Sequence, residues 1–241
     1  MPNSRTPRIV RRIIRSLFLL LILVVNVLLI WRMCSTGIPD GIRNLTLTPT
    51  LTEAYRERGN ALTFRYQEQN SITRAENNAG YFSVESAVFI PEAHQVQIVF
   101  RYNNSTLRHL MEDYGLEELP DKEETWFDVT VAATTDRTPD NRADNQDPEQ
   151  LLLTRYHATS STRETTTLYT YYRYVFDDVD VKPDTVGVFV DVYYKEDIDY
   201  ERNAYGTLCI YDDESEWKSY RLTSADKKNL KEAAQKGNEE Q

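Results

Sequence analysis

The residues best suited to chemistry in this chain are carboxylates, and the first group of them lies between residues 136 and 150. This stretch contains Asp140, Asp144 and Asp147, two prolines and no large apolar residue before Leu151. Calcium takes about six to eight oxygen ligands, often from a flexible loop. Counted from Asp136, however, the loop lacks the glycine and the terminal glutamate of a helix-loop-helix calcium site. We interpret it as a solvated acidic loop, with metal binding as the open alternative.

A second acidic group consists of Asp177, Asp178 and Asp180, between two strongly apolar stretches. Loops at the ends of strands frequently carry ligand-binding residues. Aspartate is also a common turn former, because its side chain can hydrogen-bond to its own backbone. We expect turn formation here and keep ligand contact as the alternative.

Tyr171 and Tyr172 belong to a dense aromatic stretch over residues 168–176. Exposed tyrosines can stack on sugar rings or hold a peptide partner. Aromatic residues are also favoured in strands, where alternation sends about half of them into the core. Core packing is therefore the expected role, and ligand contact the weaker one.

Motifs for catalysis or for a cofactor are not found. His94, His109 and His157 have no zinc-ligand spacing. The sequence has neither a nucleophile elbow nor a phosphate-cradling glycine loop. The prediction is therefore no catalytic residue, no metal ligand and no cofactor. A hydrolase that acts on an extracytoplasmic polymer through two carboxylates converging in space remains an alternative.

The candidate membrane-spanning segment, which would anchor the rest of the chain at a bilayer, is the uncharged apolar stretch from Ser16 to Ile30. The sixteen residues between Arg15 and Arg32 span about 24 Å as a helix, against about 30 Å of bilayer hydrocarbon. The two arginines can extend to the headgroups, and Trp31 suits the interface. Asn26 is the one polar residue inside and is a weak signal for association with another helix.

Arginine distribution predicts the orientation of this segment. Five arginines and no acidic residue precede it, which favours a cytoplasmic N-terminus and an extracytoplasmic C-terminal part in a single-pass plasma-membrane protein. A cleaved secretory signal is the alternative. The bulky Trp31–Met33 run, where small residues would be needed, argues against cleavage.

Composition narrows the partners of the remaining chain. Of 28 Lys and Arg, six precede residue 35, so 22 remain against 38 Asp and Glu, a net charge of −16. Such a domain repels phosphate backbones, so nucleic acid is excluded as a partner. The expected partners are the lipid bilayer, through the helix, and a protein or cell-surface component. The two cysteines, Cys34 and Cys209, do not predict a disulfide framework.

Alternating apolar and polar residues predict strands along most of the exported part. Short helices are expected within 50–69 with an interruption at Gly59, at 105–115 with Ser105 as cap and Gly115 at the end, and at 224–236 with Ser224 as cap. A Ser/Thr-rich turn region is expected at 159–166. The predicted strands cover residues 82–90, 96–102, 127–133, 151–156, 168–176, 186–192, 207–211 and 217–222.

Together these patterns predict a mainly β protein: an N-terminal transmembrane helix followed by an extracytoplasmic, immunoglobulin-like antiparallel β-sandwich with a few short helices. The expected function is a membrane-anchored binding or interaction module, and an accessory subunit of a membrane complex is a further alternative. The predicted divisions are a basic tail (1–15), a transmembrane signal anchor (16–33), a juxtamembrane linker with a short helical segment (34–80), the sandwich (81–223) and a C-terminal helix and tail (224–241).

Overall fold

A computed structural model describes residues 6–72, 82–134, 153–179, 187–196, 198, 206–212 and 218–239. The chain separates into two compact units, Met1–Gly37 and Ile38–Gln241. Each unit is described by itself.

The first unit is a single helix, α1 (Thr6–Thr36). Its segment Ile13–Arg32 is long and apolar enough to cross a membrane, and none of it is buried within the protein. An apolar helix with no buried face needs a nonaqueous environment or a partner to cover it. The apolar helix expected from the sequence is therefore present.

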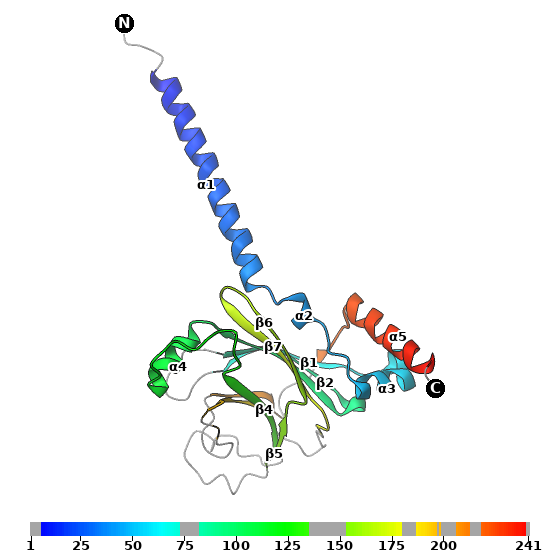
Figure 1. The fold of residues 1–241 in the computed structure, drawn as a ribbon. Helices are drawn as coiled ribbons and strands as arrows, with labels where there is room; N and C mark the ends of the chain where they lie inside the picture. The colour runs from blue at the N-terminus through cyan, green and yellow to red at the C-terminus, as the bar shows by residue number, and fades with distance from the viewer. Residues whose placement is uncertain are drawn as a thin grey trace. The chain divides into compact units, whose positions relative to one another are not determined.

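The second unit contains a six-stranded antiparallel sheet (Figure 1). Consecutive strands β2 and β3 form a tight hairpin, with Ile90 opposite Gln95. The register between these strands shifts at a bulge between Val84 and Ser86. In spatial order the strands are β10 (Lys218–Ser219), β1 (Arg65–Ile72), β2 (Phe82–Ile90), β3 (Gln95–Asn103), β7 (Tyr169–Phe176) and β6 (Ser160–Thr165).

A second antiparallel sheet has four strands among the described residues. The chain crosses between the two sheets repeatedly, because β4 and β5 pair in this sheet, β6 and β7 in the other, and β8 and β9 in this one again. In spatial order the strands are β5 (Leu153–His157), β4 (Phe127–Thr134), β8 (Gly187–Tyr194) and β9 (Gly206–Asp212).

The main core combines alternate residues of both sheets in one buried cluster. Phe127 of β4 lies edge-on to Phe82 and Tyr102 of the larger sheet, with ring centroids 5.0 and 5.1 Å apart. Edge-to-face contacts of this kind add to the stabilisation from apolar burial. The remaining members include Val96, Ile98, Phe100, Tyr172, Tyr174 and Phe176 from the larger sheet and Val129, Val131, Val188, Val190 and Val192 from the smaller.

Helices cover the opposite face of the six-stranded sheet, as Figure 1 shows for α2, α3 and α5. A second cluster joins Leu51 of α3 and Leu230 of α5 to Val88 and Ile90 of β2. A small third one joins Ile42 to strand residues. The helices are α2 (Asp40–Arg43), α3 (Pro49–Arg58), α4 (Thr106–Tyr114) and α5 (Ser224–Glu239), with 3-10 turns η1 (Gly59–Ala61) and η2 (Pro91–Ala93).

Several local predictions were wrong. The expected turn region at 159–166 contains strand β6, whose exposed edge position removes the need for apolar alternation. The interruption expected at Gly59 is confirmed, since α3 ends at Arg58 and Gly59 leaves the helix with a φ of 54°. The helical prediction for the rest of 50–69 was wrong, because η1 is a 3-10 turn and β1 begins at Arg65. Of the strand expected at 217–222, residue 217 lies outside the described residues, Lys218–Ser219 form β10, and residues 220–222 are not in a strand.

One of the two predicted capping serines occupies the N-cap position. Ser105 is the N-cap residue of α4, although its side chain forms no capping hydrogen bond. At α5 the capping residue is Thr223, whose Oγ1 accepts a hydrogen bond from the Asp226 backbone N–H at 3.0 Å. The predicted end of α4 is confirmed, since Gly115 adopts a left-handed conformation with a φ of 62°.

Replacing Val190 by Asp tests the shared core. Val190 is completely buried within the cluster formed by both sheets, so the carboxylate would lie there without a partner. We expect the free energy of unfolding to fall by several kcal/mol, measured by urea denaturation of the full chain in detergent. Ser161→Asp, at an exposed position of β6, is the control and should unfold like the parent. Equal stability of both variants would contradict the described core.

Candidate functional site

A row of buried polar side chains crosses the helix-covered face of the six-stranded sheet. Gln95 and Gln97 come from β3, and Arg173 comes from the neighbouring strand β7. All three are between 0% and 2% exposed. Buried polar groups are costly unless they are hydrogen-bonded, so their partners determine what can lie on this face.

Most of those partners belong to residues 38–48, the segment of the chain between α1 and α3. We call this segment the strap. Arg173 Nε donates to the Ile42 carbonyl at 2.7 Å, and Nη2 donates to the Arg43 carbonyl at 2.8 Å. Gln97 Nε2 donates to the Thr46 carbonyl at 2.8 Å, while its Oε1 accepts from the Thr46 N–H at 2.9 Å. The strap is thereby fixed to the sheet through its backbone.

Arg173 remains charged in this position. Burial lowers the pKa of its guanidinium to about 10, and the charges of Tyr220 and Asp226 partly oppose that shift. A third donor, Nη1, contacts Gln97 Oε1 at 3.2 Å. At neutral pH the side chain is therefore a buried cation whose donors are taken by backbone and amide oxygens.

Asp226 connects the strap to the C-terminal helix. It is 1% exposed, and its Oδ1 accepts from the Leu45 N–H at 2.8 Å. Its Oδ2 accepts from both the backbone N–H and the hydroxyl of Thr223, at 3.1 and 2.7 Å. Together with the reciprocal bond from the Asp226 N–H to Thr223 this forms a capping box at the start of α5. One carboxylate thus holds both segments.

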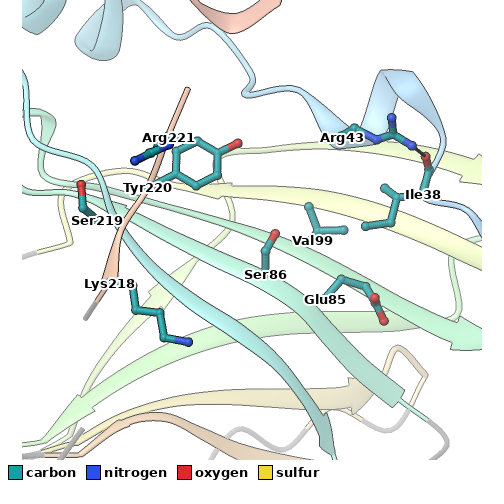
Figure 2. Close-up of a pocket in the computed structure, with 9 residues that line it drawn as sticks. All are labelled: Ile38, Arg43, Glu85, Ser86, Val99, Lys218, Ser219, Tyr220 and Arg221. Carbon is teal, nitrogen blue, oxygen red and sulfur yellow. Dashed lines mark hydrogen bonds between the residues drawn. The ribbon is translucent and has the colours of Figure 1, made fainter. Parts of the chain in front are cut away.

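A groove of about 410 Å³ opens beside the strap (Figure 2). Figure 2 shows strap residues on one side, β10 and the residues after it on the other, and strand side chains between them. A volume near the lower end of about 300–1,000 Å³ suits a small ligand or a single side chain of a partner. The described lining residues are Ile38, Arg43, Glu85, Ser86, Val99, Lys218, Ser219, Tyr220 and Arg221.

The described charges around this groove are mostly positive. Arg43, Lys218 and Arg221 contribute cations, whereas Glu85 is the one carboxylate among the described lining residues. Glu85 is already held, because Arg101 Nε lies 2.6 Å from its Oε1 and the Ser83 hydroxyl donates to the same oxygen at 2.7 Å. A groove with this lining can attract an anionic group more readily than it can activate water.

The predicted acidic site at residues 177–180 is described only in part. Asp177 accepts hydrogen bonds from Gln95 Nε2 and from the Thr159 hydroxyl, both at 2.6 Å. Asp178 is exposed and has a positive φ of 59°. Asp180 lies outside the described residues. Asp177 therefore links separate elements, and ligand contact by this group stays a prediction.

Tyr171 and Tyr172 are 0% and 2% exposed and belong to different buried clusters. Tyr172 is in the core between the sheets, and Tyr171 packs with Ile42 and Val99 beneath the strap. Neither ring is open to a ligand in this conformation, so a contact would require the surrounding segments to move.

The other predicted positions give no assembled site. Asp140, Asp144 and Asp147 lie outside the described residues. Within the described ranges no group of three or more His, Cys, Asp or Glu could hold a metal ion. His94 occupies a left-handed turn after η2.

The predicted anchor residues Arg15, Asn26, Trp31 and Arg32 all lie on α1. Asn26 Nδ2 donates to the Ile22 carbonyl of the same helix at 2.8 Å. That intrahelical bond satisfies part of the amide, which weakens the case for Asn26 as a contact between helices.

Sequence reasoning missed the strap, the buried polar row and the groove. One usable signal was Arg173, a single cation inside an aromatic stretch that otherwise reads as core. A cation in such a stretch must find oxygen partners when the strand is covered. Comparisons with protein-family models, with curated proteins and with solved structures found no match.

Replacing Asp226 by Ala tests the connection between strap and helix. The change removes the carboxylate half of the capping box, which accepts from the Thr223 N–H and hydroxyl, and it leaves the Leu45 N–H without its acceptor. We expect a loss of about 2–4 kcal/mol in the free energy of unfolding and faster amide exchange at Leu45, both measured on the full chain in detergent.

Asp121→Ala is the matched control for this experiment. Asp121 Oδ1 accepts one bond, from the Glu123 N–H, in an exposed turn. This variant should change stability by less than about 1 kcal/mol and leave Leu45 exchange unaltered. Unchanged exchange at Leu45 in Asp226→Ala would show that the strap is held by other contacts.

Proposed function

We propose that the protein is a single-pass plasma-membrane protein whose C-terminal unit is an extracytoplasmic binding module. Support for the span comes from the length and apolarity of Ile13–Arg32. Support for the orientation comes from the five arginines that precede this segment without any acidic residue. In this proposal the helix contacts the lipid bilayer, and the acidic unit meets a protein or cell-surface partner.

We further propose that the two sheets form an immunoglobulin-like sandwich. In the larger sheet, the order β2-β3-β7-β6 corresponds to strands A-B-E-D of such domains. In the smaller sheet, the order β5-β4-β8-β9 corresponds to strands C′-C-F-G. In this assignment β1 and β10 extend the first sheet at the A edge. The disulfide that joins strands B and F of antibody domains has no counterpart, since β3 and β8 contain no cysteine.

The groove between the strap and β10 is the observation that carries the binding function. Its described lining offers hydroxyls, cations and apolar surface, but only one carboxylate, and Arg101 already pairs with that one. Hydrolysis by two acids would require a second carboxylate facing it across a substrate. Recognition therefore fits this lining better than hydrolysis does.

Orientation is tested with a reporter that is active only outside the cytoplasm. Fused after Gln241 it should be active, because the arginine bias keeps the N-terminus in the cytoplasm. The same reporter fused before Met1 serves as the control and should be inactive. The reverse pattern would contradict the proposed topology, and a mature protein that begins near Ile38 would indicate a cleaved signal.

The binding role is tested by photo-crosslinking in intact cells of the natural host. A photoreactive residue at Ser219, which is exposed and lines the groove, should give a discrete adduct. The same residue at Thr162, exposed on β6 away from the lining, is the matched control. Identical adducts from both positions, or none from Ser219, would contradict a binding role for the groove.

A further inference from the structure

The charge of the groove differs in sign from the charge of the unit that carries it. Residues after Cys34 have a net charge of −16. The described lining has three cations and one carboxylate. A cationic concavity in an anionic unit focuses attraction on anions.

Arg43 is oriented by the strap itself. Its Nη2 donates to the Ile38 carbonyl at 3.0 Å, and its Nη1 lies 3.4 Å from Asp40, whose side chain is 91% exposed. A guanidinium has five N–H donors, so these two contacts leave donors for a ligand. Because the backbone carbonyl of Arg43 is bound by buried Arg173, the base of this side chain is fixed in place.

Arg221 supplies a second guanidinium from the opposite side of the groove. It is exposed, and its side chain has no hydrogen-bond or ion-pair partner among the described residues. Planar guanidinium groups bind phosphate and carboxylate oxygens in a bidentate manner. Ile38, beside Arg43, and Val99, on the sheet between the two sides, offer an apolar contact (Figure 2).

We infer that this groove is a binding site for a small organic anion, whose phosphate or carboxylate group is attracted by Arg43 and Arg221 at its two sides and whose short apolar part contacts Ile38 and Val99. The inference rests on the proposed binding function and names its ligand class. A phosphate could come from a lipid headgroup or from a free metabolite, and the chemistry of recognition is the same for both.

Isothermal titration calorimetry on the full chain tests this site, with the protein in phosphatidylcholine nanodiscs at low salt. The probes are butyl phosphate and butyrate, with butanol as the neutral match. At least one anion should bind more tightly than butanol, and Arg43→Gln or Arg221→Gln should each weaken that binding about tenfold or more. Arg108→Gln, at an exposed position of α4, should leave it unchanged.

Folding is monitored in the same samples through the exchange of the Leu45 amide, which reports on the strap and not on the two guanidinium groups. If the Leu45 amide exchanges at the parental rate in both glutamine variants, the strap is intact, and a loss of binding is due to the missing guanidinium group. Binding of neither anion beyond butanol, or binding that both substitutions leave unaltered, would overturn the inference.

A second set of nanodiscs that contain phosphatidylglycerol identifies the source of the anion. A phosphatidylglycerol headgroup in the site would compete with butyl phosphate. Binding that is weaker in these nanodiscs than in phosphatidylcholine, for the parent but not for Arg43→Gln, would therefore support the site and show that lipid headgroups occupy it. Equal binding in both lipids would support a soluble ligand. Failure of both probes alongside a discrete Ser219 adduct would overturn the anion assignment while leaving the binding module in place.

Discussion

The structure of the second unit, Ile38–Gln241, depends on how one backbone segment satisfies buried polar side chains. Arg173, Gln97 and Gln95 lie on the face of the six-stranded sheet that α2, α3 and α5 cover. Each would be costly to bury alone. Carbonyls and an amide of the strap provide partners for Arg173 and Gln97, while Gln95 Nε2 donates to the Thr48 hydroxyl at 2.8 Å and to Asp177. The strap and the polar row therefore require each other.

That arrangement links the two ends of the unit. Asp226 at the start of α5 accepts from the Leu45 N–H of the strap, so the segment that follows α1 and the last helix of the chain are held by the same carboxylate. The thin apolar face of α5, with Leu230 as its buried anchor, is sufficient because the cap adds polar contacts. The groove lies between the strap, fixed in this way, and the segment of β10 and the residues after it.

The two faces of the six-stranded sheet are built on different principles. The face toward the smaller sheet is almost entirely apolar and aromatic, with Tyr172 and Tyr174 stacked at 5.3 Å between ring centroids. The opposite face mixes small apolar clusters with a hydrogen-bonded polar row. Apolar packing tolerates several arrangements of similar volume. Hydrogen bonds are directional, so the covering segment can satisfy the buried polar side chains in only one position. The polar face is thus the one that can specify where the strap lies.

The sequence by itself determined the features that depend on local pattern. The uncharged run after Arg15 required an apolar helix, and alternation required strands at β2, β3, β4, β7 and β8, because period and hydrophobicity are local properties. The edge strand β6 was not predicted, because its residues are polar and show no apolar alternation. Tertiary structure alone decided the groove. Arg43 and Arg221 are 178 positions apart in the chain, and they face one groove only because Arg173 and Asp226, themselves distant in sequence, fix the strap and the C-terminal segment to the same sheet.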